Sequence, residues 1–371
     1  MLLGTTQMKK KTIVLASVLK PVDDTRMFEK FGISLSDSGD YHVVIIGYPS
    51  SIKPAYPNID FLPLNSFKRL SIDRLLAPLK VLLKIYQVKH DILIVNTHEL
   101  LIVALLNRII FGGKIIYDIQ ENYYRNILRT DAFPKLLKPI LALWVRAKEK
   151  LTAPFFHWFF LAEKGYENEF SFTGKKVTVL ENKPRISTHL KRENLVGEKN
   201  LLFSGTLAES TGVFQAINLV KSLHQLDNTV TLHIMGYAAQ HETYLRIMDE
   251  ISGNDFITLT GGDHLVPHTK IMEAIMKADF GIIAYPPSPH TKNSMPTKLY
   301  EYVASKLPIL LLDHKPWVEF CQQYDAAIVI DDINSTELLS HMKAKTFYTK
   351  EPNQVSWISE ETKLLEQLRK I

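Results

Sequence analysis

The chain has 371 residues, of which 46% are hydrophobic and 22% are charged, a balance typical of a soluble globular protein with two domains. The net charge of +5 is mildly basic, and Lys and Arg never gather into a run with interleaved aromatic residues, so the sequence disfavours nucleic acid as a partner. Cys321 is the single cysteine, so the chain cannot form an intrachain disulfide. Residues 13–19 are better explained as a buried strand than as a signal peptide, and no apolar run reaches the roughly 18 residues that a membrane span needs.

Short apolar segments alternate with amphipathic ones through the first half of the chain. The apolar residues of the expected strands are continuous rather than alternating, which indicates a parallel sheet covered on both faces. We expect strands at residues 12–19, 41–49, 91–97, 113–119, 157–162 and 176–182, and helices at residues 25–39, 99–111 and 134–151.

The same pattern begins again after a polar, non-periodic linker at residues 183–200. We expect strands at 200–207, 230–237, 256–262, 280–286, 308–314 and 326–332, and helices at 211–227, 268–279, 296–306, 315–324 and 356–370. In the last of these, Ser356 is the expected N-cap, with Glu360 near the capping-box position. The fold class is therefore predicted as α/β, with two doubly wound Rossmann-like domains facing a cleft and ligands bound beyond the carboxyl ends of the strands.

Residues 293–310, "NSMPTKLYEYVASKLPIL", lead from a polar loop into a short helix and then an apolar strand. Pro296 suits the first turn of that helix, and the free amides there suit phosphate or sugar oxygens. Leu299 should face the core, whereas Glu301 falls on a second face with Lys298 and Ser305. Two interpretations remain open for Glu301: a surface pair with Lys298 at helical spacing, or a ligand contact.

This segment resembles the donor-binding segment of GT-B glycosyltransferases, specifically the retaining family four. Those enzymes carry two glutamates separated by seven residues, and the second binds the ribose of a nucleotide sugar. The resemblance implies that Glu301 takes this role, whereas Asn293 stands at the position of the first glutamate. The donor-binding residues that the resemblance implies are Gly205, Thr206, Asn293, Ser294, Met295, Pro296, Lys298, Leu299 and Glu301.

The resemblance extends over nearly the whole chain, through "KPVDDTRMFEKFG", "VLENKP", "LLFSGTLAESTG" and "SWISEETKLL" in order. It implies an N-terminal acceptor domain at residues 1–183, a nucleotide-sugar domain at 184–350 and a C-terminal helix at 351–371 that crosses back to the first domain. The phosphate loop departs from the family, because Thr206 and Thr211 stand where an Arg and a Lys are usual. Lys298, Arg26 and Lys20 are candidate replacements for these two cations.

"IIYDIQENYYRNIL" supplies the expected catalytic residues, Asp118, Gln120 and Glu121, which would face the sugar or the acceptor. Relatives often carry His at the position of Gln120, and Gln cannot titrate near neutral pH. Capping of the next helix is the alternative role for Asp118. Arg26 and His98 are candidates for phosphate or acceptor contact, and the alternatives are a salt bridge at the start of a helix for Arg26 and local helix-start structure around His98.

The function implied is transfer of a sugar from a nucleotide sugar, a UDP- or GDP-sugar, to a glycan or polyprenyl-linked acceptor. The resemblance implies retention at the anomeric carbon, no cofactor and no obligatory metal, in surface polysaccharide or lipopolysaccharide synthesis on the cytoplasmic side of the membrane. The sequence has no Asp-x-Asp, no Gly-x-Gly-x-x-Gly and no P-loop. Two alternatives stay open: a nucleotide-sugar epimerase of the same fold, and a non-catalytic partner protein that has lost donor chemistry.

Residues 67–86 and 134–156 are both basic and apolar. They could rest on an anionic leaflet, which makes peripheral membrane contact an expectation for the first domain. The alternative is that their apolar faces belong to the core and their lysines are solvated.

Overall fold

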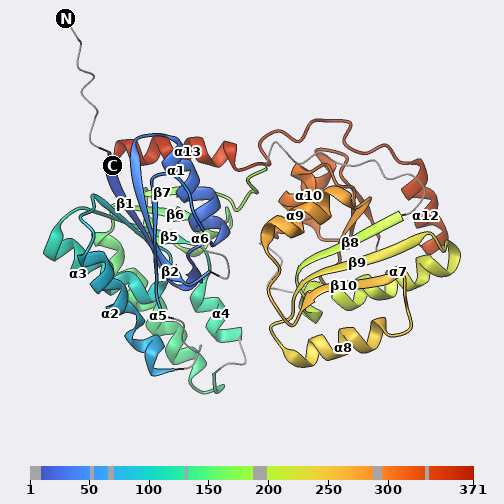
Figure 1. The fold of residues 1–371 in the computed structure, drawn as a ribbon, viewed down its shortest axis with the longest axis horizontal. Coiled ribbons are helices and arrows are strands. Elements are labelled where there is room, and N and C mark those ends of the chain that lie inside the picture. Colours follow the sequence, from blue (N-terminus) through green and yellow to red (C-terminus); the bar gives the residue numbers. More distant parts are fainter. Residues whose placement is uncertain are drawn as a thin grey trace, which may run out of the picture. The chain divides into compact units, whose positions relative to one another are not determined.

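The computed structural model describes residues 10–50, 54–65, 71–129, 133–186, 199–286, 295–330 and 334–371. The chain forms two compact units: the first contains Met1–Asn182 and Ile358–Ile371, and the second contains Lys183–Trp357. Each unit is a parallel sheet flanked by helices, as the continuous apolar strands predict (Figure 1). None of the described helices is long and apolar enough to span a bilayer.

The first unit is built on a seven-stranded parallel sheet with the order β3-β2-β1-β4-β5-β6-β7. Its strands are β1 (Lys11–Pro21), β2 (Tyr41–Tyr48), β3 (Ile59–Pro63), β4 (Ile92–Val95), β5 (Lys114–Ile119), β6 (Trp158–Leu161) and β7 (Val177–Val179). The central strand β1 places Val14 beside Val44 of β2 and Leu93 of β4. Strand β3 was missed from the sequence, because its five residues are half exposed at the edge of the sheet.

The helices of the first unit lie in two layers. They are η1 (a π-helix, Thr25–Gly32), α1 (Ile33–Asp37), α2 (Ile72–Tyr86), η2 (His98–Leu100), α3 (Leu101–Phe111), α4 (Tyr123–Arg129), α5 (Lys138–Thr152), η3 (Ala153–Phe155), α6 (Tyr166–Glu169), η4 (Ser171–Thr173) and α13 (Ile358–Lys370). Helix α3 contacts α2 and α5, whereas α13 contacts η1 and α1 on the other face of the sheet (Figure 1).

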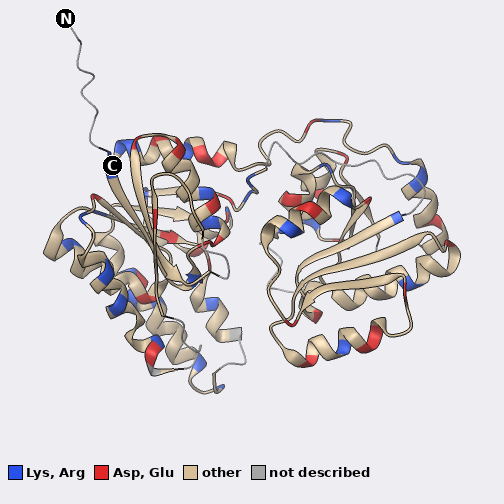
Figure 2. Cartoon of the chain, viewed as in Figure 1, with Lys and Arg blue, Asp and Glu red and all other residues tan. Residues whose placement is uncertain are grey.

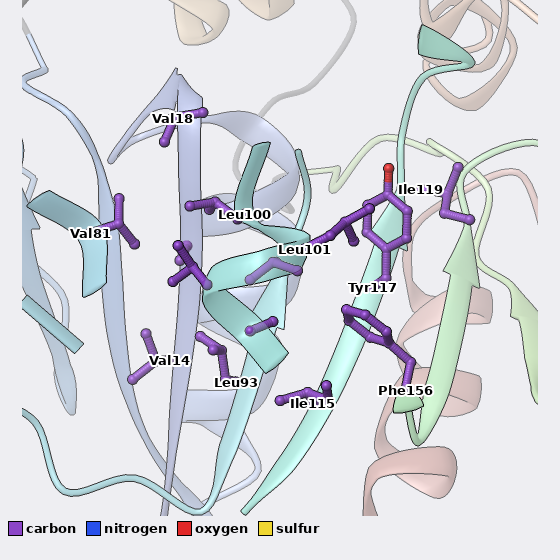
Figure 3. Close-up of a cluster of buried hydrophobic side chains, with 14 of the residues drawn as sticks. Val14, Val18, Val81, Leu93, Leu100, Leu101, Ile115, Tyr117, Ile119 and Phe156 are labelled. Carbon is purple, nitrogen blue, oxygen red and sulfur yellow. The ribbon is translucent and has the colours of Figure 1, made fainter. Parts of the chain in front are cut away.

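Apolar side chains form most of the core beneath α2 and α3 (Figure 3). Val14 and Leu93 contribute from the sheet, and Val81 of α2 and Leu101 of α3 pack onto them with no exposed surface. Each of these helices therefore buries one apolar face against the sheet.

The C-terminal helix α13 belongs to the first unit, as the fold-class prediction requires. Leu364 and Leu368 are completely buried, and Arg369 forms an ion pair with Asp40 at 3.1 Å. The helix begins at Ile358, two residues after Ser356, the expected N-cap. The fully buried carboxylate of Glu360 accepts a hydrogen bond from the Glu181 amide at 3.3 Å.

The second unit contains a six-stranded parallel sheet with the order β10-β9-β8-β11-β12-β13. Its strands are β8 (Lys199–Thr206), β9 (Val230–Tyr237), β10 (Ile257–Gly262), β11 (Phe280–Ile283), β12 (Ile309–Leu311) and β13 (Ala327–Val329). Its helices are η5 (Glu209–Thr211), α7 (Val213–Leu226), α8 (His241–Ile251), α9 (His268–Lys277), α10 (Thr297–Ala304), α11 (Lys315–Gln322) and α12 (Ser335–Ala344). The sequence analysis missed the largely exposed helix α8, whose side chains are mostly polar.

Counted within its own unit, the second sheet has the strand order 3-2-1-4-5-6, and the first sheet has the same order with a seventh strand added. The direction of winding reverses between β8 and β11 in the second unit, and between β1 and β4 in the first. In doubly wound sheets, ligands bind beyond the carboxyl ends of the strands at this reversal. The residues that follow these four strands are therefore the first places to look for a site.

Candidate functional site

The reversal point of the second unit brings together Gly205 at the end of β8 and helix α10, which follows β11. Gly205 has a φ of +99°, a conformation that other residues rarely adopt. A Cβ at this position would make an ordinary van der Waals contact with Lys298, with its Cε 3.5 Å away. The backbone conformation is therefore what calls for glycine here, and the Lys298 side chain lies beside the end of β8.

Helix α10 is buried on both its apolar and its polar face. Leu299 and Val303 are fully buried in the core, as their spacing predicts. Lys298, Glu301 and Ser305, on the second face, are also only 6%, 7% and 7% exposed. The surface-pair interpretation of Lys298 and Glu301 is therefore wrong, because neither side chain is at the surface.

The ammonium group of Lys298 is a buried cation without a hydrogen-bond partner in the described part of the chain. The Nζ atom lies 4.3 Å from the ring centroid of Phe203 and 5.1 Å from that of Tyr285, so it forms cation–π contacts with two aromatic rings. Burial lowers the pKa of Lys298 to about 7, although the nearby Glu301 carboxylate opposes this shift. A buried ammonium without an acceptor destabilises the ligand-free protein, and an anionic ligand would supply the missing acceptor.

The carboxylate of Glu301 is held by a residue from another element. Its Oε1 lies 3.0 Å from Nε2 of His268, the first residue of α9. This contact fixes one of the two carboxylate oxygens. His264, four residues earlier, instead pairs with Asp263 at 2.7 Å.

No three His, Cys, Asp or Glu side chains in the described ranges come together as a metal site would require.

The loop after β8 uses its threonines in two different ways. The Thr206 side chain is exposed, so it is available to a ligand. The Thr211 hydroxyl donates to the Thr206 carbonyl at 2.8 Å and accepts from the Ala208 amide at 3.1 Å. Gly212 then takes a φ of +83°, and a Cβ there would overlap the Ala284 carbonyl at 1.8 Å. Thr211 therefore shapes the loop and is not free to replace the usual lysine.

The other donor-binding predictions in this segment have mixed outcomes. Leu299 is a correction, because its side chain is fully buried and its amide donates to the Pro296 carbonyl at 2.9 Å. Pro296 is the N-cap of α10 rather than its first helical residue, and Met295 packs partly buried against the core. Asn293 and Ser294 lie outside the described residues.

In the first unit, two predicted site residues meet each other instead of a ligand. Arg26 is 2% exposed, and its Nε and Nη2 donate to the two oxygens of Asp118 at 2.9 and 2.7 Å. Its Nη1 donates to the Leu180 carbonyl at 2.8 Å and to Asn182 Oδ1 at 3.0 Å. This pair joins η1, β5 and the end of the unit. The geometry corrects the assignment of Arg26 to phosphate contact and of Asp118 to direct catalysis, because both groups are buried and paired.

Gln120 and Glu121 are better exposed than Asp118. The Gln120 amide donates to Asp118 Oδ2 at 2.8 Å, so the Arg26–Asp118 pair orients it. Glu121 retains 41% exposure of its side chain and lies 3.5 Å from Nζ of Lys20. Lys20 is therefore near a carboxylate of its own unit.

His98 lies at the edge of a buried polar cluster. Its Nδ1 is 3.0 Å from Nζ of Lys148, and its Nε2 is 3.5 Å from a Glu99 oxygen. Burial lowers the pKa of His98 to about 4, so the imidazole is neutral near pH 7. A neutral ring with both nitrogens occupied is poorly suited to a phosphate, and the structure does not favour that role.

The sequence analysis missed Asn96, the residue that follows β4 at the reversal point of the first unit. Asn96 is 4% exposed, and neither its side-chain nitrogen nor its oxygen has a hydrogen-bond partner in the described ranges. The hydroxyl of the fully buried Thr97 is also unpaired there. Buried amides are usually satisfied by hydrogen bonds, so an unpaired one at this strand end is a candidate ligand contact. The only sequence signal was a polar residue directly after a buried strand.

No known family model matches the chain, and no curated protein sequence matches it either. Solved structures do match. Sucrose-phosphate synthase from Thermosynechococcus elongatus is 13% identical, with a TM-score of 0.70 over 97% of this chain and 99% of that one. HepE from Anabaena, in complex with UDP-glucose, is 12% identical, with a TM-score of 0.63 over 97% and 100%.

A third match is a protein from Listeria monocytogenes named as a UDP-N-acetylglucosamine 2-epimerase. It is 11% identical, with a TM-score of 0.63 over 97% of this chain and 96% of that one. At identities this low, the matches show a shared arrangement of the backbone and say nothing about the chemistry of the site. The two-unit parallel α/β architecture, together with these matches along nearly the full length, shows that the chain has the GT-B fold.

Proposed function

We propose that this protein is a glycosyltransferase that uses a nucleotide sugar as its donor, bound at the reversal point of the second unit. The observation that carries the proposal is the buried, unpaired ammonium of Lys298 beside Gly205. A diphosphate would supply the acceptor that Lys298 lacks, at the place where doubly wound sheets bind ligands. Lys298 would then replace the Arg and Lys that are missing from the loop after β8.

Glu301 follows Lys298 by three residues, one helical turn away. A carboxylate accepts hydrogen bonds from both hydroxyls of a ribose, and such charge-assisted bonds contribute about 1.5–3 kcal/mol each. His268 holds one oxygen of Glu301, which preorganises the other for a ligand. The backbone near Gly205, the exposed Thr206 and the segment Met295–Pro296 complete the proposed donor site, with Asn293 and Ser294 as further candidates.

HepE was solved with UDP and with UDP-glucose, and this supports a uridine nucleotide sugar as the first donor to test. We propose that transfer proceeds with retention and without an obligatory metal. In this scheme the leaving phosphate takes the proton of the acceptor hydroxyl, so no strong side-chain base is required. Lys298 would stabilise the charge that develops on that phosphate.

The acceptor is proposed to be a glycan or a polyprenyl-linked sugar that binds the first unit. Asn96, Gln120 and Glu121 follow β4 and β5 and offer amide and carboxylate groups to sugar hydroxyls. Asp118 is proposed as a positioning residue that acts through Gln120. This assignment fits a role in surface polysaccharide or lipopolysaccharide assembly on the cytoplasmic side of the membrane.

Binding is tested by thermal unfolding with UDP-, GDP-, ADP- and dTDP-sugars, with and without Mg²⁺. A donor present at about 100 times its dissociation constant should stabilise the protein by roughly 2.7 kcal/mol. Glu301→Gln keeps the shape of the side chain but removes its charge, and should weaken donor binding about 10- to 100-fold. The control is Glu319→Gln on α11, a change of the same kind at a position outside the proposed site. No shift with any donor would favour the non-catalytic alternative.

The Listeria protein is named as an epimerase, so the epimerase alternative is tested as well. Product analysis without an acceptor separates the two activities. Release of a free nucleoside diphosphate only when an acceptor is added supports transfer. Conversion of the nucleotide sugar to its epimer without any acceptor would support the epimerase instead.

A further inference from the structure

The apolar surface of this protein is concentrated in one part of the first unit. Of the 24 large hydrophobic residues that are exposed in the described part of the chain, 18 lie between Leu75 and Phe155. The other six are Leu226, Leu245, Met248, Leu265, Val329 and Ile358. Single exposed apolar residues are ordinary, but a dense group on neighbouring helices marks a surface that binds something.

The exposed residues form stripes along α2, α3 and α5. They recur at helical spacing, so each helix presents a second apolar face opposite the one it buries. The stripes are Leu75, Leu79, Leu83 and Tyr86 on α2; Ile102, Leu106, Ile109 and Ile110 on α3; and Ile140, Leu143, Trp144 and Leu151 on α5.

The inward faces of these helices already fill the core. Ala77, Val81 and Ile85 of α2 are completely buried, so the outward leucines are not needed for packing against the sheet. The core explanation of these segments is therefore incomplete, because each helix has two apolar faces and only one of them is covered. Helix α3 contacts both α2 and α5, so the three helices that carry the stripes are neighbours.

The charges on the same helices are strongly biased. Along α2, α3 and α5 the basic residues are Arg74, Lys80, Lys84, Arg108, Lys138, Arg146, Lys148 and Lys150, and the acidic residues are Asp73 and Glu149 (Figure 2). Three of the basic residues form ion pairs, Arg74 with Glu99, Lys80 with Asp73 and Arg146 with the buried Glu149, so the excess positive charge comes from Lys84, Arg108, Lys138, Lys148 and Lys150. Aromatic residues lie on the same surface, where Tyr86 and Phe111 form an edge-to-face pair with centroids 5.4 Å apart. Apolar stripes, basic side chains and exposed aromatic rings together match the interface of an anionic bilayer.

We propose that the outward face of α2, α3 and α5 docks on an anionic lipid bilayer and holds the protein at the membrane surface. The apolar stripes would enter the headgroup region, and the lysines would contact anionic headgroups. A second copy of the chain fits this surface less well, because a symmetric dimer would bring two basic faces together. The inference does not depend on the donor chemistry proposed above.

The test is flotation of the full-length protein with two kinds of vesicle, phosphatidylcholine alone and phosphatidylcholine containing phosphatidylglycerol. We expect binding to the anionic vesicles that falls as salt is added, and weak binding to the neutral ones. The variant Leu75→Gln, Ile109→Gln, Leu143→Gln removes one apolar side chain from each helix and should lower the partition coefficient at least about 100-fold. The matched control changes Leu226, Leu245 and Leu265 of the second unit to Gln and should leave binding unchanged.

A charge variant separates the electrostatic part of the binding. Lys84→Gln with Lys150→Gln should weaken binding to anionic vesicles by roughly 25-fold, about fivefold for each lysine. Lys277→Gln with Lys315→Gln in the second unit is the control.

Three results would overturn the proposal: no binding to anionic vesicles, equal binding by the Leu75 triple variant and the parent, or a dimer in sedimentation equilibrium that the triple variant dissociates. Donor binding is measured on the same proteins without vesicles. Vesicle binding without any donor shift would reject the proposed function and leave the docking surface intact.

Discussion

Arg26 and Lys298 are both buried cations near the carboxyl edge of a doubly wound sheet, but their surroundings are opposite. Arg26 in the first unit donates to Asp118, Leu180 and Asn182. Lys298 in the second unit has no hydrogen-bond partner in the described ranges and lies between two aromatic rings. A buried cation whose donors are all hydrogen-bonded contributes to the structure, whereas a buried cation without an acceptor is suited to bind an anionic ligand. The difference supports the proposed donor site in the second unit.

The largest expected effect comes from breaking the paired site. Arg26→Met leaves Asp118 buried without its counter-ion and should lower the free energy of unfolding by about 3–5 kcal/mol. Urea unfolding monitored by circular dichroism measures the loss. The double variant Arg26→Met, Asp118→Leu should recover part of it, since both buried charges are then gone. A fully stable Arg26→Met protein that instead fails to bind a donor would restore Arg26 as a ligand contact.

The opposite result is expected at the unpaired site. Lys298→Met keeps the length of the side chain and removes the buried ammonium, so the ligand-free protein should gain about 1–3 kcal/mol. The same variant should lose donor affinity by about 10- to 100-fold, because the diphosphate loses its buried cation. Thermal unfolding and calorimetric titration with UDP measure the two effects. Loss of both stability and binding would contradict a cation reserved for the ligand.

The pH dependence of UDP binding and of stability is a further test of Lys298. Burial lowers the pKa of Lys298 from 10.5 to about 7, so the free protein loses this charge as pH rises above about 7. The dissociation constant for UDP should therefore rise by up to tenfold per pH unit above this value, until the pKa of the complex is reached. Between about pH 7 and 10.5 the unfolded chain binds more protons at this residue, so its contribution to the free energy of unfolding rises with pH. Calorimetry at several pH values, with Lys298→Met as the pH-independent control, measures the effect.

The smallest effect is expected at Thr211. Thr211→Val removes the hydroxyl that joins Thr206 and Ala208, and should cost about 1–2 kcal/mol of stability. Donor affinity should change by less than about threefold, because this hydroxyl shapes the loop and does not face a ligand. Parallel measurement of unfolding and UDP binding checks the separation. A tenfold loss of affinity in a stable variant would return Thr211 to the donor site.

Part of the site was predictable from local sequence. The segment around Glu301 combines a strand, a polar loop and a helix start, and its apolar spacing correctly separated Leu299 from Lys298 and Glu301. Local spacing could not show that the polar face is also buried. That depends on the packing of α10 against β8, where Tyr302 and Ser204 are joined by a hydrogen bond of 2.9 Å across 98 residues of sequence.

Helices α2, α3 and α5 give a second example. The sequence predicted basic, apolar segments at 67–86 and 134–156 and left core and membrane as alternatives. Periodicity could not decide between them, because α2, α3 and α5 each carry apolar residues on two faces. Only the position of the sheet determines which face is covered.

The sequence by itself determined the class of the fold. Strands that are apolar on both faces are buried completely only in a parallel sheet that helices cover on both sides. This pattern of strand and helix can be recognised locally, and it is repeated along the chain. The tertiary structure decided which charged residues are paired. Arg26 meets Asp118 from 92 residues away, and Lys298 meets no acceptor at all in the described ranges. The physical reason is that the free energy of a buried charge depends on which distant groups surround it, and residue spacing does not contain that information.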